Sequence, residues 1–172
     1  MRIRAAQPDD LDAVHAINAQ VVQETTISFS TEVKSRQAFA EVMKAKRLFV
    51  AAAPAGDILG YASFFPFRSG SGYAHVAEYS IALASQAQGK GIGRALMNHL
   101  ELSALEQGID ILIGGVSSSN DTGRAFHVAL GFQPVGHLPG VGRKFGETLD
   151  LYLYQKTLSR KTAVPQDQEI SQ

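Results

Sequence analysis

The sequence predicts a single domain of the mixed α/β (α+β) class, with a mostly antiparallel central sheet flanked by helices. Three observations support this prediction. The chain has 172 residues, the size of one ordinary domain. Strand and helix patterns follow one another in the order β, α, α, β, β, β, α, β, α, β. This order contains hairpins as well as two strand-helix-strand crossovers, so the sheet should be mixed rather than all parallel.

The N-terminal elements are a short strand and two amphipathic helices. A brief apolar start at Ile3 precedes the helix signal Pro8-Asp9-Asp10. Apolar residues then recur at helical spacing, at Leu11, Val14, Ile17, Val21 and Val22. Residues 25–30 break this period and predict a loop. A second helix is expected to begin at Thr31 and Glu32 and to continue through Phe39, Val42 and Met43.

The sheet and two further helices follow. Turn residues at 54–57 predict a hairpin between strands 48–53 and 58–65, and a glycine-rich loop at 68–72 leads into a strand over 76–83. The remaining expected elements are a long helix from Ile92 to Leu105 stopped by Gly108, a strand over 111–116, a short helix from about Thr122 to Leu130, and a strand over 149–154. The domain is expected to cover residues 1–158, followed by a disordered polar tail at 159–172.

Composition excludes several classes of function. Sixteen basic and sixteen acidic residues give no net charge, so no overall field attracts nucleic acid or an anionic membrane. The absence of cysteine excludes disulfides, thiolate metal sites and an acyl thioester on the protein. The N-terminus is polar, and no apolar run approaches the roughly 20 residues of a membrane span. We therefore expect a cytoplasmic protein without a metal, nucleic-acid or membrane partner.

The segment from Gln88 to Arg94 is the most informative one. Gly89, Gly91 and Gly93 alternate between a strand and a long helix, where they allow close backbone approach and where the helix N-terminus offers unpaired N–H groups to a pyrophosphate. The spacing fits a dinucleotide fingerprint poorly, because the third glycine falls one place early. It also fits a P-loop poorly, because Lys90 is followed by glycine. A glycine-rich helix start that serves packing alone is the structural alternative.

Residues 76–132 join this loop to a second set of landmarks. Gln88-x-x-Gly91-x-Gly93 is followed by Asn120, by His127 seven residues later, and by Gly131-Phe132. This combination resembles the GNAT superfamily of acyl-CoA-dependent N-acetyltransferases. The resemblance implies the GNAT fold, with acetyl-CoA as the co-substrate. The cofactor-binding residues that it implies are Ile81, Ala82, Leu83, Gln88, Gly89, Lys90, Gly91, Ile92, Gly93, Arg94 and Asn120, the first three through backbone pairing with the pantetheine arm.

Within the superfamily, the chain is similar to the branch that acetylates phosphinothricin, methionine sulfone and methionine sulfoximine. The similarity extends over residues 1 to about 158, with signatures at Ile17-Asn18, Val21-Val22, Thr25-Thr26, Arg68, Glu78-x-Ser80, 141–146 and 149–151. The chain also departs from the branch. Phe39 and Glu147-Thr148 stand where the branch has tryptophans, and Ala74, Val76 and Ala77 replace a more polar stretch. These departures concern the acceptor and leave the cofactor assignment unchanged.

Acetyl transfer to an amine needs a base. An amine of pKa about 8 or more is mostly protonated at neutral pH, so it has no lone pair to attack a thioester. Glu78 lies in an apolar strand, where burial should raise the pKa of its carboxyl above about 4.3. We expect Glu78 to remove the proton, directly or through water. A solvent-facing carboxylate, or one paired to an arginine, is the structural alternative.

The leaving thiolate of coenzyme A, of pKa about 8.5, is helped by a proton donor. His127 occupies the position at which many GNAT enzymes have tyrosine, so the resemblance implies that it is the general acid, itself or through water. A packing or capping histidine is the alternative. The other histidines lack comparable spacing and are expected to be surface or structural residues: His15, His75, His99 and His137.

The resemblance implies an acceptor with a carboxylate and an acidic or sulfone-like tail. A guanidinium binds such oxygens through two parallel hydrogen bonds, and Arg68, in its glycine-serine loop, is the candidate. A solvated surface arginine is the alternative. The other residues expected at the acceptor site are Ser69, Gly70, Glu78, Tyr79 and Ser80, with Phe29 and Lys144 as walls.

The sequence thus predicts direct transfer of an acetyl group from acetyl-CoA to the primary amine of a small amino-acid analogue. A ternary complex is expected because no thiol is present to store the acetyl group. The resemblance also implies a homodimer. The alternatives are acetylation of a protein N-terminus or an antibiotic amine, and an acyl-CoA-binding sensor without turnover.

Overall fold

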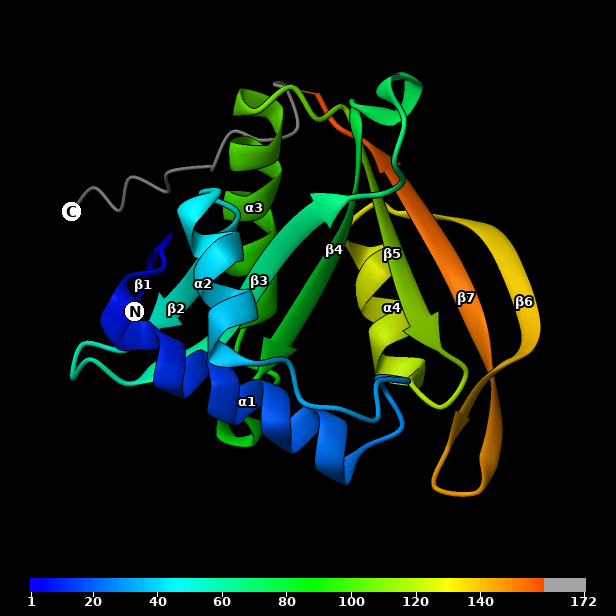
Figure 1. Ribbon diagram of the computed structural model, residues 1–172, viewed down its shortest axis with the longest axis horizontal. Coiled ribbons are helices and arrows are strands. Elements are labelled where there is room, and N and C mark those ends of the chain that lie inside the picture. The colour runs from blue at the N-terminus through cyan, green and yellow to red at the C-terminus, as the bar shows by residue number, and fades with distance from the viewer. Residues whose placement is uncertain (160–172) are drawn as a thin grey trace, which may run out of the picture.

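The computed structural model describes residues 1–159, in which a seven-stranded sheet carries two helices on each face (Figure 1). The strands lie in the order β1-β2-β3-β4-β5-β7-β6, and only β4 and β5 pair in parallel. The strands are β1 (Arg2–Ala5), β2 (Leu48–Ala52), β3 (Ile58–Pro66), β4 (Val76–Leu83), β5 (Ile111–Ser117), β6 (Gln133–Lys144) and β7 (Glu147–Thr157). The predicted mixed, mostly antiparallel sheet is confirmed.

The helices are α1 (Leu11–Glu24), α2 (Arg36–Lys44), α3 (Ile92–Glu106) and α4 (Asp121–Ala129). Helices α1 and α2 cover one face of the sheet, where the ring of Phe39 packs edge-on against Tyr61 of β3 at 5.4 Å. Helices α3 and α4 cover the other face, where His99 packs against Phe49 at 5.1 Å and His127 lies near Tyr79 at 5.8 Å, between ring centroids. Alternate residues of the central strands β3 and β4 therefore contact different helix pairs.

Strand β6 is the element that the sequence does not predict. It contains Pro134, Pro139 and three glycines, is mostly exposed, and pairs with β7 through two register shifts. Proline, glycine and bulges are typical of an edge strand and hide the alternation on which strand prediction depends. The second predicted crossover is consequently wrong: α4 leads to β6 at the edge, and β7 returns antiparallel to β5.

The predicted start of the second helix is also wrong. Helix α2 begins at Arg36, five residues after Thr31. The side chain of Ser35 accepts a hydrogen bond from the backbone N–H of Ala38 at 3.1 Å and thereby caps the helix. The backbone N–H of Lys34 donates to Asn18 Oδ1 of α1 at 3.0 Å, which ties the preceding segment to α1. The remaining predicted elements are present, with small shifts at their ends.

The pairing of β4 with β5 is short, and this feature positions the site. Register partners exist only from Val76↔Ile111 to Glu78↔Ile113. Beyond Glu78, β4 pairs with β3 alone and β5 with β7 alone, and Figure 1 shows the two strands diverging toward the bottom of the view. One edge of β4 is therefore unpaired from Tyr79 onward and can pair with an extended ligand.

Strand β7 ends at Thr157, and the domain boundary near residue 158 stays a prediction. The tail expected to be disordered lies, apart from Ser159, outside the described residues.

Candidate active site

Two adjoining cavities occupy the gap between β4 and β5. The inner cavity, of about 290 Å³, is lined by Glu78, Tyr79, Ser80, Gly114 and His127 among others. The outer cavity, of about 690 Å³, is lined by residues of the glycine loop and of α1. Both cavities share the lining residues Ile81, Ala82 and Asn120. An elongated ligand can thus extend from the glycine loop to the carboxyl of Glu78.

The glycine loop owes its shape to glycines with two different roles. Gly89 and Gly91 adopt positive φ values of 73° and 77°, which side-chain-bearing residues rarely adopt. Gly93 lies in the first turn of α3, where an added Cβ would lie 3.2 Å from two ring carbons of Phe126. The first two glycines turn the chain into the helix, and the third lets Phe126 pack against it. The helix N-terminus then faces the outer cavity.

Most of the predicted cofactor-binding residues are brought together here. The outer cavity is lined by Ile81, Ala82, Leu83, Gln88, Gly89, Gly91, Ile92, Gly93, Arg94 and Asn120. Lys90 is exposed and is not part of the lining. The guanidinium of Arg94 also donates to the backbone carbonyl of Ala129 at 3.3 Å, which links α3 to the end of α4.

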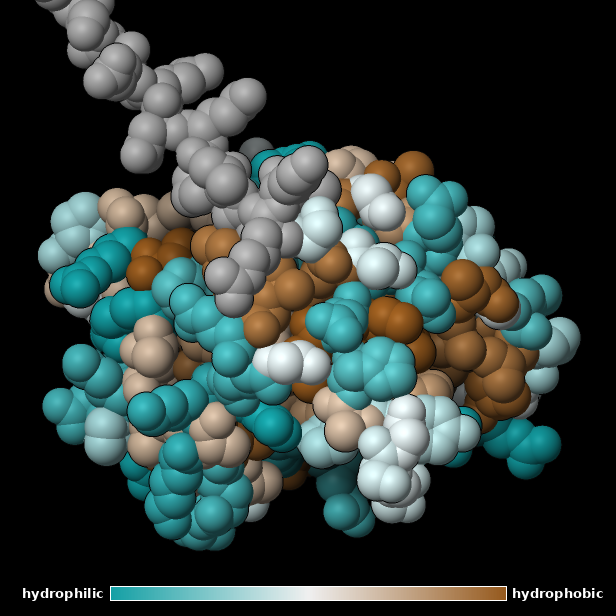
Figure 2. Space-filling model, turned by 90° about the horizontal axis from the view of Figure 1, so that it is seen from above, coloured by the Kyte–Doolittle hydropathy of each residue, from teal (hydrophilic) through white to brown (hydrophobic). Residues whose placement is uncertain are grey.

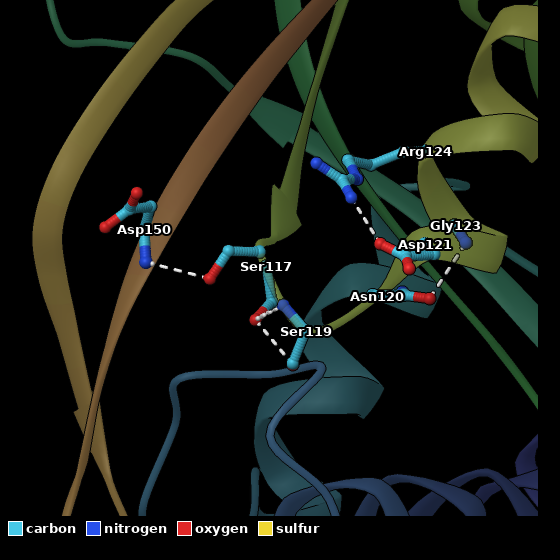
Figure 3. Close-up of polar contacts among 8 residues, drawn as sticks. Ser117, Ser119, Asn120, Asp121, Gly123, Arg124 and Asp150 are labelled. Atoms are coloured by element: carbon cyan, nitrogen blue, oxygen red, sulfur yellow. Dashed lines mark hydrogen bonds and ion pairs between the residues drawn. The ribbon is translucent and has the colours of Figure 1, made fainter.

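Asn120 caps α4 and lines both cavities. Its Oδ1 accepts a hydrogen bond from the backbone N–H of Gly123 at 2.8 Å, as Figure 3 shows, and Arg124 pairs with Asp121 on the same turn. An added Cβ at Gly123 would lie 2.4 Å from the Nδ2 of Asn120, so a side chain there would displace the capping amide. Because the cap uses the Oδ1, the Nδ2 is left as a donor to a ligand in the gap.

Glu78 is half-buried at the last β4–β5 pair, and it has no hydrogen bond or ion pair within residues 1–159. Burial raises the pKa of its carboxyl, and the positive charge of Arg68 acts in the opposite direction. The arginine-paired carboxylate considered above is therefore absent from this part of the chain. A carboxylate without a partner and with a raised pKa is suited to accept a proton at neutral pH.

His127 is buried on the α4 side of the gap. Its Nδ1 lies 2.6 Å from the backbone carbonyl oxygen of Gly123, so the Nδ1–H donates to that carbonyl and Nε2 carries the lone pair. Burial lowers the pKa of the imidazole, which the hydrogen bond to Gly123 only partly offsets. The ring stacks on Tyr79 and packs edge-on or tilted against the rings of Phe126, Phe132 and Tyr154. The buried imidazole is thus neutral, and its Nε2 is directed away from the helix.

The predicted acceptor residues divide into two groups. Phe29, Glu78, Tyr79 and Ser80 line the inner cavity. Arg68, Ser69 and Gly70 lie in an exposed loop outside the lining, although Arg68 is near enough to influence the Glu78 carboxyl. Lys144 is also outside the lining: its Nζ is buried and donates to the backbone carbonyl of Ser28 at 2.8 Å, which holds the segment beside Phe29.

Several lining residues lie outside the predicted set. Asn18 donates through Nδ2 to the hydroxyl of Tyr61 at 3.2 Å, and both side chains line the inner cavity on the α1 side. A polar residue within the apolar stripe of α1 is the sequence signal that points to Asn18. Gly114 and Gly115 also line this cavity, and glycines inside a strand commonly mark a close approach by a ligand or side chain.

Two features of the described residues bear on the predicted partners. Within residues 1–159, no group of three or more histidine, aspartate or glutamate side chains is arranged to hold a metal ion. None of the helices in the same range is long and apolar enough to cross a membrane.

These features define an enzyme class that takes a group from a nucleotide-bearing carrier and passes it to a nucleophile. The helix N-terminus suits the pyrophosphate, the open β4 edge suits an extended arm, and Glu78 suits removal of a proton. Residues 16–132 match the sequence model of the acetyltransferase (GNAT) family. The chain belongs to the GNAT family.

Individual relatives agree with this assignment. The chain is 33% identical over 168 residues, covering 95% of its length and 98% of the relative, to an L-methionine sulfoximine/L-methionine sulfone acetyltransferase from Pseudomonas paraeruginosa. It is 36% identical to a phosphinothricin N-acetyltransferase from Alcaligenes faecalis, over 91% of this chain and 82% of that one.

Among solved structures, a GNAT phosphinothricin acetyltransferase from Sinorhizobium meliloti in complex with AcCoA matches with a TM-score of 0.86. The two chains are 28% identical, and the match covers 95% of this chain and 91% of that one. The protein is thus an N-acetyltransferase with the GNAT fold, and acetyl-CoA is its co-substrate.

The close packing at Gly93 gives a first prediction. We expect Gly93→Ala to raise the Kd for acetyl-CoA roughly fivefold, about 1 kcal/mol, because its Cβ pushes Phe126 into both cavities. Isothermal titration calorimetry measures this change. Gly136→Ala on β6 is the control, since its Cβ would lie 3.4 Å from the nearest Leu153 carbon, an ordinary contact remote from the cavities. An unchanged Kd for Gly93→Ala would contradict the described role of this glycine.

Proposed function

We propose that the protein acetylates the primary amine of a small amino-acid analogue such as phosphinothricin, methionine sulfone or methionine sulfoximine. The names of two relatives that match more than nine-tenths of the chain support this class of acceptor. The observation that carries the proposal is the unpaired, half-buried Glu78 carboxyl where β4 and β5 separate. A small amine that enters the inner cavity meets this carboxyl directly.

Each proposed role follows from chemistry available in the site. Glu78 removes a proton from the acceptor ammonium, directly or through water. The neutral amine attacks the thioester carbon, and the C–S bond breaks with its electron pair going to sulfur. The acylated nitrogen then loses its second proton, which the Nε2 of neutral His127, itself or through water, takes up and passes to the coenzyme A sulfur. The pyrophosphate is bound by the backbone of the glycine loop, and the pantetheine arm by the free edge of β4.

The decisive experiment is an acceptor panel with acetyl-CoA, in which the release of free coenzyme A is measured. Phosphinothricin, methionine sulfone and methionine sulfoximine are compared with an aminoglycoside and a peptide N-terminus. Release with the amino-acid analogues alone is the expected result. Release with the peptide or the aminoglycoside alone would replace the proposed acceptor. Tight acetyl-CoA binding without release to any amine would identify a sensor.

Arg68 carries the second prediction. We propose that its guanidinium binds the acceptor carboxylate, and we expect Arg68→Ala to raise the acceptor KM about 10- to 100-fold at unchanged acetyl-CoA affinity. Arg68 also lowers the pKa of Glu78. Its loss should therefore raise that pKa and move the acid limb of kcat/KM to higher pH.

The matched control for this prediction is Arg68→Lys, which keeps the positive charge but loses the bidentate geometry. It should raise the acceptor KM while leaving the acid limb in place. An Arg68→Ala variant with the wild-type acceptor KM would remove Arg68 from the acceptor site.

We also propose a homodimer in the cytoplasm. Several large apolar side chains are exposed on the C-terminal half of α4 and along the β6–β7 hairpin: Val128, Val135, Leu138, Val141 and Phe145. Figure 2 shows hydrophobic side chains on the side of the molecule where β6 and β7 lie. Such a patch favours contact with a second copy. Light scattering of the purified protein and cell fractionation test the two proposals.

A further inference from the structure

The hydroxyl of Tyr79 is buried without a partner. It is the one fully buried side-chain nitrogen or oxygen atom that lacks a hydrogen bond in the part of the chain that the structure describes. Leaving a buried hydroxyl unbonded is unfavourable, and such atoms in native proteins call for a physical explanation. Tyr79 also lines the inner cavity, so a ligand in that cavity can supply the missing partner.

The absence of a side chain at Gly114 leaves room for this hydroxyl. A Cβ added at Gly114 would lie 2.8 Å from the Tyr79 hydroxyl oxygen and 2.8 Å from the Nε2 of His127. Both polar atoms therefore lie together over the backbone of Gly114, in the position that a side chain would take. Tyr79 and Gly114 are the first residues beyond the last β4–β5 pair, Glu78↔Ile113, so this position lies where the two strands begin to separate.

Tyr79 and Glu78 are adjacent on β4 and point to opposite faces of the sheet. Ser80 hydrogen-bonds to Tyr61, which packs on α2, so Ser80 and Glu78 lie on the face of α1 and α2. Tyr79 packs with His127 and Phe132 on the face of α3 and α4. When the carbonyl carbon of the thioester is held between β4 and β5, the incoming amine and the sulfur therefore lie on opposite faces of the sheet. The amine approaches from the Glu78 side, and the carrier sulfur, which arrives from the N-terminus of α3, lies on the Tyr79 side.

Tyr79 is a hydrogen-bond donor rather than an acid. Burial and the charge of Glu101 raise the pKa of its hydroxyl well above the ordinary value, so the proton stays on oxygen. Nε2 of neutral His127 holds a lone pair and cannot donate to sulfur in this protonation state. Of the two atoms that face Gly114, the Tyr79 hydroxyl alone carries a hydrogen.

We propose that Tyr79 is a further catalytic residue, whose hydroxyl donates a hydrogen bond to the coenzyme A sulfur as the C–S bond breaks. The electron pair of that bond goes to sulfur, and Tyr79 keeps its own proton throughout. The hydrogen bond strengthens as negative charge develops, so it favours the transition state over the neutral thioester. The inference rests on the proposed acetyl transfer and adds a donor that acts on its leaving group.

Tyr79→Phe tests the inference because it removes a single oxygen. We expect kcat to fall about 10- to 100-fold, the range for losing a hydrogen bond to a charged group, with an unchanged Kd for acetyl-CoA. The melting temperature should stay the same or rise, since the lost hydroxyl has no partner in the folded protein. The acid limb of the pH profile should also stay in place, because Glu78 is unaltered.

The control is Tyr154→Phe, whose buried ring packs against the same imidazole at 5.2 Å without lining the inner cavity. Its kcat should remain within about twofold of wild type. A Tyr79→Phe variant with wild-type kcat would overturn the role of Tyr79 while leaving acetyl transfer intact. A parallel loss of melting temperature and kcat would also overturn it, by showing a structural role. Wild-type protein that releases no coenzyme A with any amine would refute both the proposed function and this inference.

Discussion

Glu78→Gln is expected to lower kcat/KM for the amine acceptor by about 10² to 10⁴, the range for loss of a general base. The amide has nearly the shape of the carboxyl, so acetyl-CoA affinity and melting temperature should stay close to wild type. The wild-type carboxyl is half-buried and unpaired, so no ion pair breaks in this substitution. Steady-state kinetics with saturating acetyl-CoA measure the loss.

The pH dependence of this variant provides a second check. Burial raises the pKa of Glu78, and the carboxylate is the form that accepts a proton. Wild-type kcat/KM should therefore rise with pH through this raised pKa. The variant should lose this limb and keep only the rise due to deprotonation of the free amine. A Glu78→Gln variant with the wild-type rate and pH profile would show that Glu78 is not the base.

Lys156→Met is expected to give the largest loss of stability. Nζ of Lys156 lies 2.7 and 2.8 Å from the two carboxylate oxygens of Glu101, whose side chain is only 3% exposed. Removing the lysine leaves a buried charge without a partner, which costs about 3–5 kcal/mol. The melting temperature should fall by roughly 10 °C for a domain of this size. Differential scanning calorimetry measures both quantities.

The loss of stability in Lys156→Met should depend on pH through the Glu101 carboxyl. Burial raises the pKa of Glu101, while the hydrogen bond and charge of Lys156 lower it. In Lys156→Met only the raising effect remains, so the folded variant takes up a proton at higher pH than the unfolded chain. Its destabilisation should therefore shrink as the pH falls.

The matched control is the double variant Glu101→Leu with Lys156→Met, which removes both charges. It should recover much of the lost stability, because no unpaired charge remains in the core. A Lys156→Met protein as stable as wild type at neutral pH would show that the pair contributes nothing.

The parts of the fold that depend on local sequence were predictable. The bounds of β4, Val76–Leu83, agree with the prediction because its apolar run ends in turn residues. The start of α3 at Ile92 follows from the three glycines and the helical period behind them. The motif spacing also predicts that Asn120 and His127 lie together at the gap, because Asn120 caps the short helix α4 and His127 lies within it.

What depends on tertiary structure was not predictable. Strand β6 is stabilised by pairing with β7 rather than by its own proline- and glycine-rich sequence. His127 and Tyr79 lie together over Gly114 only because α4 brings His127 to the β5 backbone. The distance of Arg68 from the cavity depends on the path of an exposed loop, and hydrophobic periodicity does not predict that path. Non-local pairing and side-chain direction therefore account for most of the differences.

The central claim is that acetyl-CoA lies in the gap between β4 and β5. The most direct measurement is a crystal structure with acetyl-CoA bound. We expect the pyrophosphate within hydrogen-bond distance of the backbone N–H groups of residues 89–94, the pantetheine arm along residues 81–83, and the thioester between Glu78 and Tyr79. Acetyl-CoA bound elsewhere, with an unoccupied glycine loop, would contradict this account.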